Sequence, residues 1–205
     1  MLFFELLQIA LGNRERLSVT PSEAEWTELF SFAQEQTLVG IAFTGIELLP
    51  VEQRPPKMLL MQWYSLANLI KVRNAEQDRK SLAVANRFLK DGFKSVILKG
   101  QGMAQLYAQG EYRVPGDIDI WIEGDRKTIM NWVSDYSPKN APVYHNVSIC
   151  PIGGTEIEVH FTPSWMNCYF TNRTLQNFFR QYSKKIFCNE EHFVISEDGS
   201  CYYKQ

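Results

Sequence analysis

The sequence lacks several features that mark common protein classes. No uninterrupted apolar run approaches the roughly 18 residues of a membrane-spanning helix, so we expect no membrane-embedded segment. None of the cysteines forms a C-x-x-C pair, which argues against a zinc knuckle or a dithiol redox centre. We therefore expect reduced thiols in a cytoplasmic protein. The cysteines are Cys150, Cys168, Cys188 and Cys201.

A strong excess of charge of one sign is also absent. The 21 Lys and Arg residues nearly balance the 23 Asp and Glu residues, which leaves a formal net charge of -2. Such a chain has no global positive field with which to hold the phosphates of a long polynucleotide. Nucleic acid is therefore not favoured as a partner.

Apolar material, in contrast, is plentiful. Of the 205 residues, 45% are hydrophobic, which is enough for one sizeable core or two small ones. The apolar segment 1–11 has no basic start of the kind that export signals carry, and it contains Glu5. We expect this segment to form an amphipathic first helix.

The segment Thr20-Pro21-Ser22-Glu23 predicts the start of a second helix. Thr20 would be the N-cap, Pro21 the first helical residue, and Glu23 the acid that reaches back to the cap amide. Apolar residues then follow at the spacing that places them on one buried stripe. They are Trp26, Leu29, Phe30 and Ala33.

Two further helices are expected in the first half of the chain. One covers residues 38–49, and prolines at 50, 55 and 56 place a loop after it. Residues 57–90 contain neither Pro nor Gly, and their apolar spacing fits one long helix or two abutting helices. Asp91-Gly92 supplies a stop.

After Gly92 the period of the apolar residues changes. Alternation and β-branched residues predict four strands, at 95–98, 116–122, 143–149 and 155–162, with a turn at Gly153-Gly154. Helices are expected at 101–108, after a cap at Asp125, and at 171–182, and one more strand at 192–195. The fold class is therefore α+β, with a helical region at 1–93 followed by a small mixed sheet flanked by helices at 94–205.

Asp117 and Asp119 alternate with isoleucines in one of these strands. On a strand both carboxylates leave one face while Ile118 and Ile120 enter the core. Two neighbouring anions favour a cation between them, and hard oxygen ligands suit Mg²⁺ or Mn²⁺. A solvated strand face is the simpler interpretation of an isolated Asp-x-Asp, so the pair needs supporting residues.

Support comes first from the segment Lys99-Gly100-Gln101-Gly102, which follows a strand and opens a predicted helix. Backbone amides at such a turn can receive a triphosphate, and glycines let it approach closely. An ordinary tight turn remains the alternative for the glycines. Lys99 either reaches a phosphate or is simply solvated.

Support comes second from the alternating segment 156–161. Glu156, Glu158 and His160 share one face of this strand, and one of the acids can complete a three-carboxylate cluster. For Glu156 we prefer a solvated position. We interpret His160 as a packing or hydrogen-bonding neighbour, because no second His lies at ligand spacing.

Together these residues carry a family resemblance. The segment 96–100, then Tyr107 and Arg113, then 116–120 with Asp117 and Asp119, and finally 158–160, resemble the uncharacterised nucleotidyltransferase family of the polymerase-β-like superfamily. Its motif is an apolar residue and Gly, then Asp-apolar-Asp on a strand, then a third acid on a later strand. Many members carry Gly-Ser where this chain has Gly100-Gln101.

The resemblance implies a nucleotidyltransferase-like core at 94–205 and a metal-dependent reaction with an NTP donor. Asp117 and Asp119 would hold one or two Mg²⁺ (or Mn²⁺) ions, and Glu158 would complete the second metal site and help to deprotonate the acceptor. Lys99, Gly100 and Gln101 would bind the phosphates of the NTP. Arg113 would neutralise phosphate or hold a substrate carboxylate, unless it forms an ion pair with Asp117 or Asp119.

The acceptor of the nucleoside monophosphate is expected to be a hydroxyl group of a small molecule or a protein. Two alternatives remain open. The chain could be a catalytically inactive module that binds nucleotide, or a protein-interaction module with the same fold. Binding of Mg²⁺ and NTP separates these alternatives, because a ligand that binds the folded state raises its melting temperature.

Overall fold

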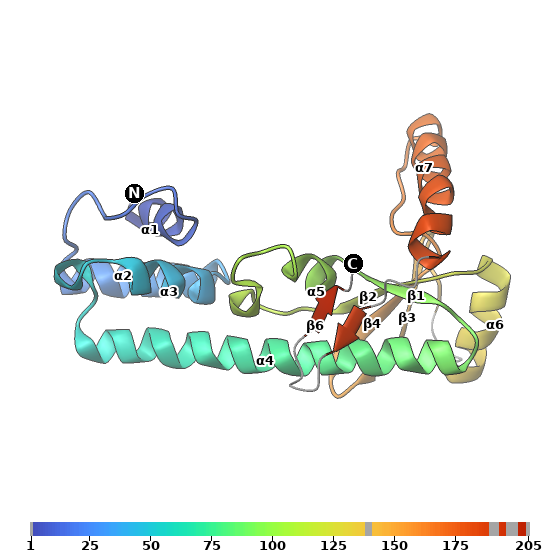
Figure 1. Ribbon diagram of the computed structural model, residues 1–205, viewed down its shortest axis with the longest axis horizontal. Coiled ribbons are helices and arrows are strands. Elements are labelled where there is room, and N and C mark those ends of the chain that lie inside the picture. Colours follow the sequence, from blue (N-terminus) through green and yellow to red (C-terminus); the bar gives the residue numbers. More distant parts are fainter. Residues whose placement is uncertain (1, 138–140, 189–192, 196–200, 204–205) are drawn as a thin grey trace. The chain divides into compact units, whose positions relative to one another are not determined.

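The computed structural model describes residues 2–137, 141–188, 193–195 and 201–203. The chain divides into two compact units, one built from residues 1–75 and 108–115 and the other from residues 76–107 and 116–205 (Figure 1). The long helix α4 (Lys57–Lys90) contributes to both. The predicted α+β class is confirmed, with helices first and a small mixed sheet after them.

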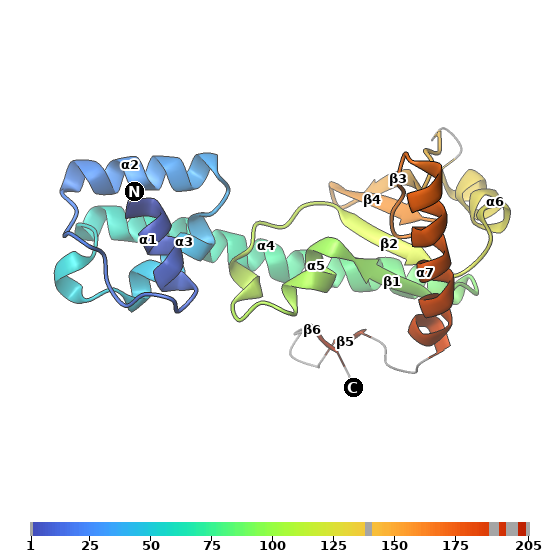
Figure 2. The ribbon, with the colours of Figure 1, turned by 90° about the horizontal axis from the view of Figure 1, so that it is seen from above.

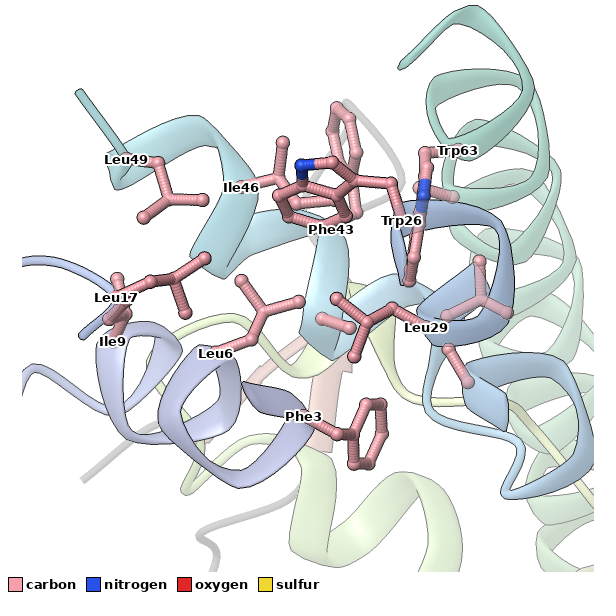
Figure 3. Packing of buried hydrophobic residues seen from close by; sticks show 14 of the residues in the cluster. Phe3, Leu6, Ile9, Leu17, Trp26, Leu29, Phe43, Ile46, Leu49 and Trp63 are labelled. Carbon is pink, nitrogen blue, oxygen red and sulfur yellow. The ribbon is translucent and has the colours of Figure 1, made fainter. Parts of the chain in front are cut away.

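The first unit is helical. It contains α1 (Leu2–Ala10), α2 (Glu23–Glu35), α3 (Val39–Leu48), the 3₁₀ turns η1 (Val51–Gln53) and η2 (Gly110–Tyr112), and the first part of α4. Its core is aromatic and aliphatic, as Figure 3 shows. The largest fully buried side chains there include Trp26, Trp63, Phe3, Leu6 and Ile46.

The start of α2 corrects a prediction. Its N-cap is Ser22 and not Thr20, and Glu25 forms the capping box: its carboxylate accepts from the Ser22 amide (2.8 Å), and its own amide donates to the Ser22 hydroxyl (3.3 Å). In this register the buried residues Pro21 and Trp26 occupy the two positions of a hydrophobic staple. Burial of Pro21 and Trp26 therefore favours Ser22 over Thr20 as the N-cap.

The second unit is built around a four-stranded sheet with the order β1-β2-β4-β3. Strands β2 and β4 are parallel, and the other neighbours are antiparallel. Figure 2 shows the sheet with α4, α6 and α7 around it. The elements are β1 (Ser95–Leu98), α5 (Lys99–Ala104), β2 (Ile118–Ile122), α6 (Arg126–Tyr136), β3 (Asn146–Ile152), β4 (Thr155–His160) and α7 (Tyr169–Cys188), followed by the short hairpin β5 (Phe193–Ile195) and β6 (Cys201–Tyr203).

One face of this sheet is apolar, and the opposite face carries polar side chains of β2 and β4 beside the buried Trp121. The apolar face packs against Val84 and Phe88 of α4 and against Ile129 and Val133 of α6. The strands supply its other side, with Ile118, Ile120, Ile122, Val147, Ile149, Ile157 and Val159. The isoleucines of β2 lie in the core as predicted. Polar side chains from the same strands therefore lie on the opposite face.

Several element boundaries differ from the sequence prediction. Helix α5 ends at Ala104 and does not reach residue 108, and Leu106 and Tyr107 after it are exposed. Strand β3 begins at Asn146 and not at 143, because the amide of Val143 donates to the carbonyl of Asn146 (2.9 Å) in a local turn. Strand β4 ends at His160, and α7 is longer than expected at both ends.

Other predictions fall on the termini and on membrane association. The strand at 192–195 is observed as β5, with His192 outside the described residues. Within the described part of the chain, no helix combines the length and the apolar character that a membrane crossing requires. Cys150 and Cys168 are free and exposed, whereas the side chains of Cys188 and Cys201 lie outside the described set.

Candidate metal centre on the polar face of the sheet

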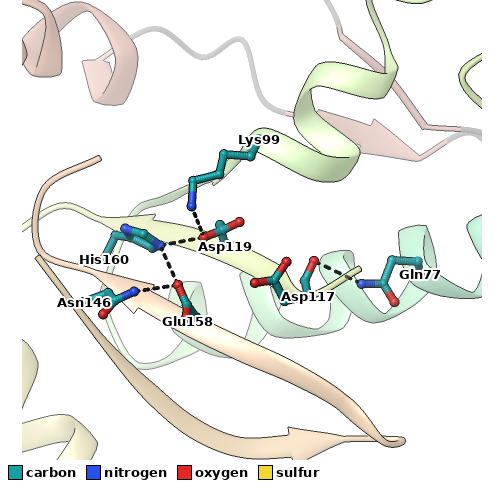
Figure 4. A network of polar contacts seen from close by, with 7 residues as sticks. All are labelled: Gln77, Lys99, Asp117, Asp119, Asn146, Glu158 and His160. Carbon is teal, nitrogen blue, oxygen red and sulfur yellow. Dashed lines mark hydrogen bonds and ion pairs between the residues drawn. The ribbon is translucent and has the colours of Figure 1, made fainter. Parts of the chain in front are cut away.

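The site is built on the parallel pair β2 and β4. Asp119 lies directly opposite Glu158 in the strand register, so the two carboxylates leave the same face of the sheet (Figure 4). His160 follows Glu158 by two residues and shares that face. Asp119 is only 3% exposed and His160 is fully buried, whereas the side chain of Glu158 is 30% exposed. A buried anion is therefore paired with a carboxylate that solvent can reach.

The three side chains converge. His160 Nε2 lies 2.8 Å from Asp119 Oδ1 and 3.5 Å from Glu158 Oε2. One ligand atom from each residue lies within 4.8 Å of the other two. Asn146 of β3 donates a hydrogen bond to Glu158 Oε2 (2.5 Å), which fixes the orientation of that carboxylate. Among the described residues these three side chains form a group able to hold a metal ion.

A fourth side chain, Lys99, approaches from the turn between β1 and α5. Its Nζ lies 2.7 Å from Asp119 Oδ1. Partial burial alone would lower the pKa of Lys99, but the hydrogen bond and charge of Asp119 raise it. Burial alone would raise the pKa of Asp119, but hydrogen bonds from His160 and Lys99 outweigh it and the pKa is lowered. Both partners of this pair are therefore charged at neutral pH.

The turn that carries Lys99 has an unusual backbone. Lys99 has a φ of 43°, a conformation that costs energy for a residue with a side chain, and Gly100 follows with a φ of 20°. A Cβ on Gly102 would lie 2.6 Å from the carbonyl oxygen of Ile97, so α5 packs against the β1 backbone at a distance that only glycine permits. The predicted order of strand, glycine turn and helix is confirmed here.

Helix α4 anchors the loops around the site. Gln77 Nε2 donates to the carbonyls of Gly116 (2.8 Å) and Asp117 (3.3 Å), and Lys80 Nζ donates to the carbonyl of Gly153 (2.9 Å). The first contact explains why β2 begins at Ile118 and not at residue 116, since a side chain occupies these carbonyls. The sequence analysis missed both α4 residues, although polar residues at core positions of a helix are a recognisable signal.

Gln101 makes a similar link to α4. It is buried, and its Nε2 donates to Asp78 Oδ1 (2.6 Å). Burial raises the pKa of Asp78, and the hydrogen bond from Gln101 opposes that change. The side chain of Gln101 is thus turned toward α4 and away from the solvent-accessible part of the site.

Two other predicted residues are not among the three converging side chains. Asp117 is exposed and precedes β2, but its charge helps to raise the pKa of Lys99 (Figure 4). Arg113 belongs to the first unit, where its Nη1 is buried without a hydrogen-bond partner among the described residues. The sequence allowed an ion pair between Arg113 and Asp117 or Asp119. In the structure Lys99 forms an ion pair with Asp119.

His160 is both a hydrogen-bonding neighbour of Asp119 and a possible metal ligand. The predicted hydrogen-bonding neighbour is confirmed by its contact with Asp119. The same nitrogen also belongs to the group able to hold a metal ion. The alternation of segment 156–161 already placed His160 beside Glu158, but the missing second histidine led us away from a ligand role.

The donor set fits a divalent ion. Two donors on adjacent corners of an octahedron, each about 2.1 Å from the ion, lie about 3.0 Å apart. The distances of 2.8 and 3.5 Å from His160 Nε2 to the two carboxylate oxygens bracket that spacing. Carboxylate oxygen and imidazole nitrogen are both established ligands of divalent ions in proteins.

Comparison with known proteins identifies a related family. A family model described as an uncharacterised nucleotidyltransferase matches residues 22–198. No curated protein and no solved structure matches the chain. The matched range covers most of both units and includes every residue of the candidate metal centre.

Proposed function

This chain belongs to the uncharacterised nucleotidyltransferase family, and from that membership we propose that it transfers a nucleoside monophosphate from an NTP to a hydroxyl group of a small molecule or a protein. The observation that carries this proposal is the pairing of Asp119 with Glu158 on adjacent parallel strands. Because the balanced charge of the chain offers no general phosphate-binding surface, recognition must come from this local site.

We propose that Asp119, Glu158 and the neighbouring Asp117 hold a divalent ion, Mg²⁺ or Mn²⁺. When bound, such an ion supplies positive charge that stabilises the attacking and leaving oxygens of a phosphoryl transfer. The lowered pKa of Asp119 supports this role, because a ligand carboxylate must be ionised to bind a cation.

Lys99 is the proposed phosphate contact. Its side chain is 59% exposed, so the ammonium group can leave Asp119 and pair with a phosphate of the NTP. Gly100 presents no side chain to obstruct that approach. For Gln101 we propose a contact through the backbone amide, since its side chain binds Asp78. Arg113 stays a sequence-based proposal for binding phosphate or a substrate carboxylate.

The chemical step that we propose is a displacement at the α-phosphorus. The acceptor oxygen forms a bond to this phosphorus, the bond to the bridging oxygen breaks, and pyrophosphate leaves. Glu158 is partly exposed and takes up the proton of the acceptor hydroxyl. Asn146 keeps the Glu158 carboxylate oriented for that transfer through its hydrogen bond to Oε2.

Two further assignments belong to this proposal. We propose that residues 94–205 carry the transferase core and that residues 1–93 form a separate helical region. We also propose that the protein works in the cytoplasm, an assignment that the free thiols of Cys150 and Cys168 support.

The test uses each of the four NTPs labelled at the α-phosphate, with cell extract as the source of acceptor. Transfer of label should fall by about 100-fold or more in Asp119→Asn and Glu158→Gln, because each removes a charge from the site. Glu156→Gln is the matched control, since Glu156 is exposed two residues earlier on β4 and should leave transfer unchanged. Equal labelling by all four proteins would exclude this chemistry.

The alternatives give different results in the same preparation. A nucleotide-binding module without turnover would melt at a higher temperature with Mg²⁺ and NTP but would transfer no label. A protein-interaction module would show neither effect. The exposed position of Glu158 and the charged pair of Lys99 and Asp119 favour the enzyme.

A further inference from the structure

The imidazole of His160 is the least expected member of the metal centre. It is fully buried, its Nε2 points toward the carboxylates of Asp119 and Glu158, and its Nδ1 has no hydrogen-bond partner among the described residues (Figure 4). The polar contacts of His160 are all on the side of the metal centre.

The free Nδ1 also leaves the tautomer of His160 open to change. With the proton on Nε2, the ring donates to Asp119 Oδ1, as it can at 2.8 Å. With the proton on Nδ1, the Nε2 lone pair faces both carboxylates and can bind a cation. A cation between the carboxylates would repel a proton on Nε2 and would stabilise the second form. Arrival of a cation therefore favours the ligand form.

Such a donor set selects among divalent ions. Mg²⁺ prefers oxygen ligands, demands regular octahedral geometry and keeps several of its waters. Imidazole nitrogen is a better ligand for first-row transition ions than for Mg²⁺, and Mn²⁺ is the weakest binder of that series. Asp119 and Glu158 alone would not discriminate strongly, so the nitrogen of His160 decides the preference.

The local charge agrees with a divalent cation. Three carboxylates, on Asp117, Asp119 and Glu158, act electrostatically on Lys99, which supplies a single positive charge. The excess of negative charge leaves room for a dication even while Lys99 stays near. Asn146 donates to Glu158 Oε2, and the remaining lone pairs of the carboxylate can still bind a cation.

We propose that Asp119, Glu158 and His160 form a mixed nitrogen and oxygen site that binds Mn²⁺ in preference to Mg²⁺, with Nε2 of His160 as a direct ligand. This rests on the metal site of the proposed function and specifies the ion that it takes. The competing interpretation makes His160 a positioning residue that only donates a hydrogen bond to Asp119. The two interpretations differ in whether nitrogen touches the ion.

Pulsed electron paramagnetic resonance answers that question on the unmodified protein. Mn²⁺ is added to the full chain without nucleotide, and magnetic coupling to ¹⁴N is measured. Direct coordination by imidazole should give a clear ¹⁴N signal, and competition should require roughly 10-fold more Mg²⁺ than Mn²⁺ at half occupancy. Mn²⁺ that binds without ¹⁴N coupling, equal affinities for the two ions, or no binding of Mn²⁺ would each overturn the proposal.

Two histidine variants sharpen the result. His160→Gln keeps a group that can hydrogen-bond to Asp119 and removes the imidazole, so it should lose the ¹⁴N signal and most of the roughly 10-fold preference. His145→Gln is the matched control, since the ring of His145 contacts His160 but is not among the three donors. If the ¹⁴N signal persists in His160→Gln and disappears in His145→Gln, the ligand is His145 and not His160. That result would overturn the proposal.

The metal experiment is independent of catalysis. A ¹⁴N signal without transfer of label would support the mixed site and reject the proposed enzyme. Transfer of label with Mn²⁺ bound through oxygen alone would keep the enzyme and reject the mixed site. Circular dichroism of each variant shows that it is folded, and the unmodified protein gives the decisive signal even if His160→Gln does not fold.

Discussion

The ammonium group of Lys99 and the carboxylate of Asp119 form an ion pair of 2.7 Å at the oxygen that also faces His160. The same oxygen cannot keep the ammonium group of Lys99 and bind a metal ion without rearrangement. Lys99 is the partner that can move, because its side chain is mostly exposed whereas Asp119 and His160 are buried. The free protein thus holds its buried aspartate with an internal cation until another cation replaces it.

Replacing Lys99 with methionine should change metal and nucleotide binding in opposite directions. Without nucleotide, Lys99→Met should bind Mn²⁺ more tightly, by up to about fivefold, since a partly exposed ion pair contributes up to about 1 kcal/mol. Its affinity for NTP should fall, because a phosphate contact is lost. Calorimetric titration of each ligand measures both effects. Lys90→Met is the control on exposed α4 surface, and parallel changes in that variant would contradict the assignment to Lys99.

The sequence predicted the two faces of β4 well because alternation is a local property. Ile157 and Val159 are fully buried, and Glu158 and His160 lie together on the other face. The pairing of Asp119 with Glu158 is not local. It depends on the parallel register of β2 and β4, which no short pattern encodes, so alternation offered the meeting of these acids as a possibility and the family motif singled out Glu158.

The exposed position of Asp117 could not be predicted for a different reason. Asp117 and Asp119 have the spacing of one strand face, but the backbone at Asp117 is bound by Gln77 from α4 and does not join β2. A contact between segments forty residues apart decides this boundary. Alternation of polar and apolar residues predicts a strand only where the backbone can pair with a neighbouring strand.

A signal for the α4 contacts was nevertheless present in the sequence. Buried residues follow one stripe of this helix, and the middle of the stripe is polar where an apolar core position would be expected. The stripe is Ile70, Asn74, Gln77, Ser81, Val84 and Phe88. Buried amide side chains such as Asn74 and Gln77 need partners, and both bind backbone carbonyls from another part of the chain.

Replacing Gln77 with methionine tests the importance of that anchor. Gln77→Met keeps the length of the side chain but removes its hydrogen bonds to the carbonyls of Gly116 and Asp117. Unfolding free energy should fall by about 1–3 kcal/mol, because the carbonyls lose a partner in a partly buried setting. Urea denaturation measures the change. Gln62→Met, at an exposed position of α4, should have little effect, and equal losses in both variants would argue against the anchor.

Gly102 should tolerate no side chain. Gly102→Ala would bring a Cβ to 2.6 Å from the carbonyl oxygen of Ile97. Because relieving this clash requires the backbone to move, we expect the unfolding free energy to fall by about 1–3 kcal/mol. Gly116→Ala is the matched control, since its Cβ would meet no atom within 4 Å. That substitution should be neutral or should stabilise the fold slightly by reducing the entropy of the unfolded chain. A neutral Gly102→Ala in thermal melts would mean that α5 moves away from β1 freely.

Asp91 should make the stability of the second unit depend on pH. Its Oδ2 accepts hydrogen bonds from Trp132 Nε1 (2.7 Å) and from Arg87 Nε (2.9 Å), and these contacts lower the pKa of Asp91 from its usual value of 3.8. Because the folded pKa lies below the unfolded one, the stabilisation is present above pH 3.8 and is lost as the pH falls through the folded value. Asp91→Asn should therefore melt below the unmodified protein at pH 7, and the difference should shrink as the pH drops under 4. Asp135→Asn on the exposed side of α6 is the control and should show no such trend. If the difference in melting temperature between Asp91→Asn and the unmodified protein stays constant from pH 7 to pH 3, the charge of Asp91 does not stabilise the fold.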